Sequence, residues 1–301
     1  MQAALNEAYR HGAVGRDIFG SGFSVDVVVH PGAGAYICGD ETGLLESLEG
    51  KRGFPRIKPP YFPAAIGLYG EPTVVNNVET MSNVPWIILN GGAAFAALGE
   101  ETSTGTRMFA LSGHVRRPGN YEVEMAKTTF SDLIYAPEYG QGLAEGRSLK
   151  CFIPGGASSP WFGPDQVDLP LRQDAVGKAG SMLGSGSIVV MDDSTCVVRA
   201  AWRITRFFAR ESCGQCTPCR EGSGWLEKIM RRLESGVGRE EDLDLLMDVC
   251  DGISPGLHYW PPEQTTICPL GPSIPPPIVS GIRLFRDDFL THIKEAGCPY
   301  A

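Results

Sequence analysis

The sequence predicts an α/β region followed by an all-α region. In roughly the first two-thirds of the chain, short runs rich in β-branched residues alternate with helical stretches and with clusters of glycine and proline. From Thr195 onward, apolar residues recur every three or four positions, which is typical of amphipathic helices. The 301 residues, 43% of them hydrophobic, can bury more than one core. We therefore expect mixed α/β units first and a helical bundle last.

The composition excludes several function classes. The net charge is −9 and no basic block stands out, so nothing supports binding to nucleic acid or to an anionic membrane surface. No stretch approaches the length of a transmembrane helix, and the first residues lack the features of a signal peptide. We expect a soluble cytoplasmic chain, whose nine cysteines serve metal ligation or lie buried as thiols rather than forming disulfides.

Each expected unit has its own set of elements. The first should contain a strand at residues 24–29 and helices at 2–12, 40–48 and 74–89. The second should be a small mixed domain with strands at 108–113, 121–123 and 148–153. The third should contain helices at 200–210, 224–233, 241–249 and 282–293, interrupted by a proline-rich stretch between 253 and 277.

The strongest chemical signal is a group of cysteines. Cys213, Cys216 and Cys219 have C-x2-C-x2-C spacing, so a tight loop can direct three sulfurs at the corners of one cubane. A [4Fe–4S] cluster then needs a fourth thiolate, which Cys268 can supply from a loop fixed by the following proline. Cys250 is the spare candidate, but it ends a helix-like segment without a loop signal.

The alternative for this group is a structural zinc site. Such a site usually takes two separate C-x2-C pairs, whereas these four ligands divide three and one, which favours the cluster. The remaining thiols have no comparable spacing and are expected to be buried or incidental; they are Cys38, Cys151, Cys196, Cys250 and Cys298.

Two loops in the first unit suit a nucleotide. Gly32-Ala33-Gly34 follows the expected strand, although the full G-x-G-x-x-G spacing is absent. Asp40 and Glu41 at the next helix start argue against a phosphate there and favour contacts to ribose or ring atoms. Residues 73–80 offer adjacent amides and a hydroxyl for phosphate and ribityl groups, with simple helix capping as the alternative. Lys58 lies beside two prolines, and a solvated surface lysine is its alternative.

Five motifs in one order give a specific resemblance. Together they resemble the FMN-carrying subunit of respiratory complex I, the F subunit of NADH-quinone oxidoreductase, over essentially the whole chain. The motifs are GAGAYICGDET at 32–42, SLEGKRG at 47–53, PRIKPP at 55–60, VNNVET at 75–80 and ESCGQCTPCREG at 211–222.

The resemblance implies a fold and a set of site residues. It implies a partial Rossmann-like flavin domain at 1–100, a ubiquitin-like β-grasp domain of the SLBB type at 101–192, and a helical bundle with a [4Fe–4S] cluster at 193–301. Glu41 and Lys58 would lie on the nicotinamide-nucleotide side, and the four cluster cysteines match directly. The flavin contacts would be Tyr36, Gly39, Asp40, Val75, Asn76, Asn77 and Thr80.

The chain departs from the family pattern in three places. The family usually has Glu where Asp40 stands, and residues 60–63 hold one residue more than usual, which leaves adenine stacking by Tyr61 or Phe62 open. The family's glycine-rich loop and acidic loop, which build much of the FMN and NADH pocket, do not occur. We expect a fragment; a missing half supplied by another polypeptide is the alternative.

The resemblance also implies an activity. NADH would reduce FMN, and single electrons would pass to the cluster and onward toward quinone, without a general acid or base from this chain. The partners would be other peripheral-arm subunits, especially the [2Fe–2S] subunit and the large iron–sulfur subunit, on the inner face of the plasma membrane. Two alternatives stay open: a diaphorase subunit of an NAD-linked hydrogenase or formate dehydrogenase, and a non-catalytic scaffold that binds zinc.

Overall fold

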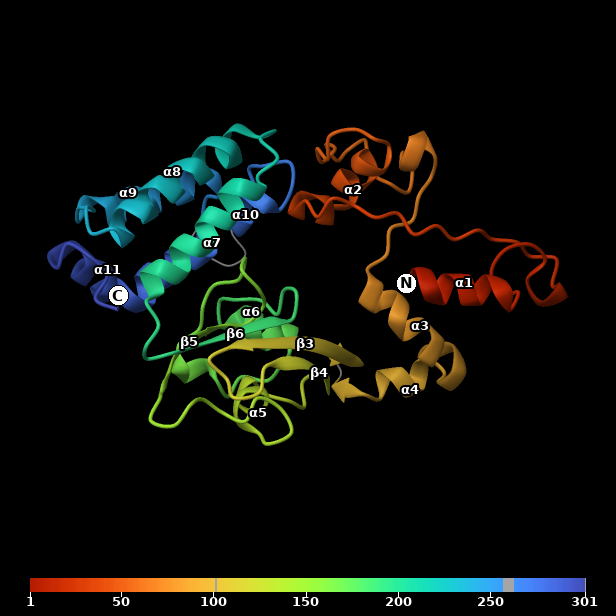
Figure 1. The fold of residues 1–301 in the computed structure, drawn as a ribbon, viewed down its shortest axis with the longest axis horizontal. Helices are drawn as coiled ribbons and strands as arrows, with labels where there is room; N and C mark the ends of the chain where they lie inside the picture. The colour runs from red at the N-terminus through yellow and green to blue at the C-terminus, as the bar shows by residue number, and fades with distance from the viewer. Residues whose placement is uncertain (101, 257–262, 301) are drawn as a thin grey trace.

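The computed structural model describes residues 1–100, 102–256 and 263–300. Part of the proline-rich stretch expected between 253 and 277 therefore lies outside the described residues. Figure 1 shows a mixed sheet in the centre, a helical bundle packed beside it, and an N-terminal segment that extends away from both. No helix among the described residues is both long and apolar enough to cross a membrane.

The N-terminal segment contains helices but no strand ladder of its own. The predicted helices are confirmed as α1 (Gln2–Arg10), α2 (Glu41–Leu48) and α3 (Val78–Asn90), and α4 (Gly92–Ala96) follows. Short 3₁₀ turns lie at η1 (Ile18–Gly20), η2 (Tyr36–Gly39) and η3 (Leu68–Gly70). The predicted strand at 24–29 is wrong, because its backbone makes only an isolated bridge from Val25 to Gly15, and Val28 is 82% exposed. A β-branched run forms a strand only beside a second backbone, and no described segment provides one here.

The central unit is a four-stranded mixed sheet. Its strands are β3 (Thr106–Gly113), β4 (Gly119–Glu124), β5 (Leu149–Ile153) and β6 (Ser187–Asp192), in the order β4-β3-β6-β5 with a parallel β3–β6 pair. Three of these strands confirm the sequence prediction, and β6 adds to it. The short pair β1 (Gly99–Glu100) and β2 (Ser103–Thr104) precedes the sheet, and α5 (Phe130–Tyr135), η4 (Pro164–Gln166) and α6 (Gln173–Lys178) complete the unit. Phe109, Phe130 and Phe152 are fully buried in its core.

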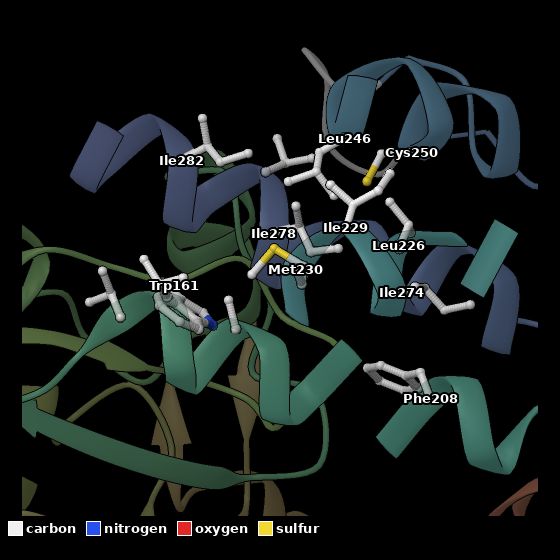
Figure 2. Packing of buried hydrophobic residues seen from close by; sticks show 14 of the residues in the cluster. Trp161, Phe208, Leu226, Ile229, Met230, Leu246, Cys250, Ile274, Ile278 and Ile282 are labelled. Carbon is white, nitrogen blue, oxygen red and sulfur yellow. The ribbon is translucent and has the colours of Figure 1, made fainter. Parts of the chain in front are cut away.

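The C-terminal unit is a bundle of α7 (Val197–Glu211), α8 (Thr217–Glu234), α9 (Glu241–Ile253) and α11 (Pro275–Lys294), with the short α10 (Leu270–Ser273). Figure 2 shows its core, in which Met230 and Ile229 of α8 lie close to Ile278 of α11. α11 begins earlier than the predicted 282, inside the proline run. Prolines are tolerated there because the first-turn amides of a helix have no intrahelical acceptor.

The bundle and the sheet share one core. Trp161, which follows β5, is 3% exposed and packs among the bundle residues (Figure 2). Its backbone amide donates to Ser280 Oγ on α11 at 3.0 Å. Ile37 of η2 belongs to the same buried cluster. The bundle therefore fixes both the sheet and the segment around η2.

Candidate cofactor site

The connection between α7 and α8 brings the three closely spaced cysteines to one end of the bundle. Cys213 and Cys216 lie half-buried in the loop, and Cys219 is buried in the first turn of α8. Gly214 has φ +82°, a left-handed conformation that glycine adopts without strain. This conformation turns the loop sharply between the first two cysteines.

Cys268 joins this group from a distant part of the chain. It is buried directly before α10, and the neighbouring Ile267 amide donates to Cys216 Sγ at 3.3 Å. Cys213 and Cys219 are close enough to Cys268 to act on its pKa. The structure therefore brings together the four cysteines predicted as cluster ligands. Cys250 is fully buried within α9, in the bundle core, and its raised pKa comes mainly from burial.

Polar groups surround the sulfurs. Ser212 Oγ lies 3.2 Å from Cys219 Sγ. The guanidinium of Arg220 crosses the loop and donates to the Gly214 carbonyl at 3.0 Å, which places a positive charge beside the cysteines, as their negative cluster would require. Such hydrogen bonds and charges are the usual means by which a protein adjusts an iron–sulfur cluster.

Burial raises the pKa of two of the four cysteines. Burial raises the pKa of Cys219, and nearby Cys213 and Cys216 raise it further. Burial also raises the pKa of Cys268 to about 11, although the Leu270 amide partly offsets it. At neutral pH these groups would stay protonated unless a cation compensated the thiolate charge. Bound iron would supply that charge.

The described residues contain one ligand group compact enough for a single zinc ion. Tetrahedral zinc with Zn–S bonds of about 2.3 Å needs sulfurs about 3.8 Å apart. Among the described residues, one group of three or more His, Cys, Asp or Glu ligands has all its atoms within 4.8 Å, and it consists of Cys196, Glu234, His292 and Cys298. The four predicted cluster cysteines do not form such a compact group among the described residues.

Part of the predicted flavin set lies beside the cysteines. Tyr36, Gly39 and Asp40 line a cavity of about 240 Å³ whose wall also contains Cys268 and Pro269. The Tyr36 amide donates to Glu211 Oε2 at 2.9 Å. Its ring meets Phe207 of α7 edge-on, with centroids 5.0 Å apart, and burial raises the pKa of its hydroxyl. These contacts hold the η2 segment against the cysteine end of the bundle.

The two carboxylates at the start of α2 are already engaged. Asp40 Oδ1 caps the helix by accepting from the amides of Thr42 and Gly43, both at 2.9 Å. This cap satisfies two of the amides at the helix N-terminus. Glu41 Oε1 pairs with Lys58 Nζ at 2.6 Å, so Lys58 is not a freely solvated surface lysine. The structure thus places the two residues predicted for the nicotinamide side together.

The rest of the predicted flavin set lies elsewhere. Asn77 Oδ1 accepts from the Glu79 amide at 2.8 Å, which is the helix-capping alternative. Thr80 lines a separate cavity of about 490 Å³ that it shares with Phe95 and Arg107. No hydrogen bond, ion pair or ring contact of the described residues joins these positions, or Val75 and Asn76, to η2. In Figure 1, α3 correspondingly lies well apart from α2.

A larger cavity was not anticipated from the sequence. It measures about 740 Å³ and reaches Gln215 in the cysteine loop, whose buried Oε1 has no hydrogen-bond partner among the described residues. Arg56 lines it and pairs with Glu46 at 2.5 Å and Glu49 at 2.9 Å. The three-residue spacing of Glu46, on α2, and Glu49, its C-cap residue, was the available signal.

Glu49 and Tyr61 also line this cavity. Hydrogen bonds from the Lys51 side chain and from the Tyr69 amide lower the pKa of Glu49 to about 2. Tyr61, one of the two aromatic residues considered for adenine stacking, lines the cavity wall.

Comparison with known proteins shows to which family the chain belongs. Residues 1–86 match the family model of the Nuo51 FMN-binding domain, 108–137 the SLBB domain, and 199–292 the NADH-ubiquinone oxidoreductase-F iron-sulfur binding region. An F subunit of NADH-quinone oxidoreductase from Rhizobium meliloti is 46% identical over the whole chain, which covers 68% of that relative. The chain belongs to the family of NADH-quinone oxidoreductase F subunits. The resemblance drawn from the five motifs is confirmed.

A second relative and a solved structure show how much of each protein this chain covers. The F subunit of NADH-quinone oxidoreductase from Mycobacterium tuberculosis is 50% identical over 99% of this chain, which spans 64% of that relative's length. Among solved structures, an NAD⁺-reducing [NiFe]-hydrogenase in its H₂-reduced state is 33% identical with a TM-score of 0.77, over 92% of this chain and 44% of that one. The predicted α/β plus all-α fold class is thereby confirmed.

Proposed function

We propose that this chain is the electron-input part of an NADH:quinone oxidoreductase, receiving electrons from FMN on a [4Fe–4S] cluster held by Cys213, Cys216, Cys219 and Cys268. One observation carries the proposal. The cavity lined by Tyr36, Gly39 and Asp40 has Cys268 in its wall, so predicted flavin contacts and a predicted cluster ligand border one space. A donor and an acceptor of single electrons need such proximity.

The residues of this chain bind and orient rather than react. When bound, FMN accepts a hydride from NADH and releases electrons singly to an iron–sulfur centre. Tyr36 is anchored by Glu211 and Phe207, which fixes the cavity wall. The Ile267 amide and Ser212 hydroxyl stabilise negative charge on the sulfurs. The Glu41–Lys58 pair would meet the nicotinamide nucleotide.

The proposal extends to the chain's context. We place the unit boundaries at 1–100, 101–192 and 193–301, and the flavin contacts at Tyr36, Gly39 and Asp40, because Val75, Asn76, Asn77 and Thr80 lie apart from them. We place the chain in a peripheral arm on the inner face of the plasma membrane, beside a [2Fe–2S] subunit and a large iron–sulfur subunit. The family membership supports this context.

Metal analysis of the anaerobically purified chain tests the cluster. We expect about four iron and four sulfide per chain, and a paramagnetic signal on reduction. Cys268→Ala should lose this iron, whereas the matched control Cys250→Ala should keep it, because Cys250 lies within α9. Iron absent from the wild-type chain, with zinc at these cysteines instead, would favour the scaffold alternative and overturn the proposal.

Flavin binding gives a separate measurement. We expect FMN to bind weakly to the isolated chain, because the structure brings only Tyr36, Gly39 and Asp40 to the cysteine end. Titration of the chain with FMN, followed by flavin fluorescence, measures the affinity. Tight stoichiometric FMN on this chain would show that the described residues suffice for the flavin.

A second function is favoured by the structural similarity to the NAD⁺-reducing hydrogenase. In that case the chain would be a diaphorase subunit that exchanges electrons between NAD(H) and a hydrogenase rather than a quinone. Purification of the native complex distinguishes the two. NADH-dependent quinone reduction supports the first function, and hydrogen-dependent NAD⁺ reduction supports the second.

A further inference from the structure

A second group of ligand side chains lies at the opposite end of the α7–α8 pair from the cluster cysteines. Cys196 caps the start of α7, and Glu234 is the last residue of α8. His292 lies in the last turn of α11, and Cys298 follows that helix. Their ligand atoms all lie within 4.8 Å of one another, and Cys196 and His292 are buried.

The three distances among Cys196, Glu234 and His292 match those of a tetrahedral ion, and Cys298 Sγ lies within 4.8 Å of each of these ligand atoms. Cys196 Sγ lies 3.3 Å from His292 Nε2 and 3.7 Å from Glu234 Oε2. His292 Nε2 lies 3.6 Å from Glu234 Oε2. Zinc bonds of about 2.3 Å to sulfur and about 2.0 Å to nitrogen or oxygen give edges of about 3.3–3.8 Å. The three measured edges fall in this range.

The surrounding contacts orient three of the four ligand side chains. His292 Nδ1 lies 2.7 Å from the Asp288 carbonyl, to which it can only donate, so Nε2 keeps a free lone pair toward Cys196. Arg199 Nε donates to Glu234 Oε1 at 2.5 Å, which leaves Oε2 for the group. The Arg199 amide donates to Cys196 Sγ at 3.2 Å. Backbone and charged partners of this kind are characteristic of metal ligands.

We propose that Cys196, Glu234, His292 and Cys298 bind one structural Zn²⁺ ion. Two sulfurs, an imidazole nitrogen and a carboxylate oxygen form a closed four-coordinate set that suits zinc. The ion would join the ends of α7, α8 and α11 and fasten the C-terminal segment to the bundle. About fifteen residues of α8 separate this site from Cys219, or roughly 22 Å along a helix. Zinc has no redox chemistry, so its role is to stabilise the bundle.

Metal analysis with matched variants tests the site. We expect about one zinc per chain after anaerobic purification, in addition to the iron. Cys298→Ala and His292→Ala should each weaken zinc binding by at least about ten-fold while iron stays. Cys38→Ala, which removes another half-buried thiol outside the proposed zinc ligands, should leave zinc unchanged. Cys213→Ala should lose iron and keep zinc.

A cobalt titration of the zinc-depleted chain provides a second readout. Co²⁺ at this site should give thiolate-to-metal absorption that persists in Cys213→Ala and disappears in Cys298→Ala. If wild-type chain holds no zinc and binds no cobalt, the inference is wrong. It is equally wrong if zinc follows Cys213 rather than Cys298, or if thiol counting finds a Cys196–Cys298 disulfide. Iron analysis of the same samples shows whether the four cluster cysteines are occupied, so failure of the cluster and failure of the zinc site are distinguished.

Discussion

Asp242 shows how a single buried charge is stabilised in this protein. Its side chain is 1% exposed and accepts from the Arg239 amide at 2.8 Å and from Arg232 Nε at 2.9 Å. Burial by itself would raise the pKa of this carboxyl, but these hydrogen bonds and the two positive charges outweigh it and lower the pKa. The ionised form therefore stabilises the folded bundle.

We expect Asp242→Asn to reduce the free energy of unfolding by about 1–3 kcal/mol at pH 7, because Arg232 loses its charged partner. Asp244→Asn, at an exposed position of the same helix, should change it by less than about 0.5 kcal/mol. Denaturant unfolding measures both. Equal effects of the two substitutions would show that the buried pair contributes nothing specific.

The same carboxyl gives a pH dependence. Because its pKa is lower in the folded state than the unfolded value of about 3.9, its stabilisation is complete above that value and is lost as pH falls through the folded pKa. The stability difference between wild type and Asp242→Asn should therefore shrink as the pH falls below about 4. A constant difference across this range would contradict the assignment.

At the scale of elements, the short helix α5 depends on its cap. Thr129 Oγ1 accepts from the Asp132 amide at 3.0 Å, while Asp132 Oδ2 accepts from the Thr129 amide at 2.9 Å. This reciprocal pair starts a six-residue helix whose Phe130, Leu133 and Ile134 complete the sheet core. A helix this short needs such fixed ends.

We expect Thr129→Ala to destabilise the sheet unit by about 1 kcal/mol. Thr128→Ala makes the same change one residue earlier, where the side chain forms no cap, and should have a smaller effect. Thermal unfolding followed by circular dichroism compares them. A larger loss in Thr128→Ala would contradict the role of the cap.

At the scale of the whole molecule, burial divides the chain unevenly. α1 and α3 contain no buried residue, and Leu89 of α3 is 84% exposed. α8 by contrast buries seven residues, and its core is continuous with the sheet through Trp161. Helices without a buried face open readily, since packing supplies most helical stability.

Hydrogen exchange of the isolated chain should show this division. We expect amides of α1 and α3 to exchange at least about a hundred-fold faster than those of α8. Strands β5 and β6 should lose protection together with α11, because they bury side chains in one core. Mass spectrometry of peptides from each element measures the rates. Protection of α3 comparable to that of α8 would show that the exposed N-terminal elements are stabilised by contacts beyond burial.

The sequence by itself determined the local features of this protein. The spacing of Cys213, Cys216 and Cys219, with Gly214 between the first two, brings these thiols together in the loop and the first turn of α8. The capped start of α2 follows from Asp40. The helices of the bundle could be predicted because their periodicity is a property of neighbouring residues. The five motifs identified the family for the same reason, since each is a short local pattern.

Only the tertiary structure decided what depends on distant residues. It placed Cys268, rather than Cys250, beside the cysteine loop. It left residues 24–29 without a partner strand among the described residues. It placed Thr80 in a different cavity from Tyr36, although both were predicted as flavin contacts. It also gathered two thiols expected to be incidental, Cys196 and Cys298, into a ligand group. Packing brings residues that are far apart in the sequence to within a few ångströms of one another. Such contacts cannot be predicted from residue spacing along the chain.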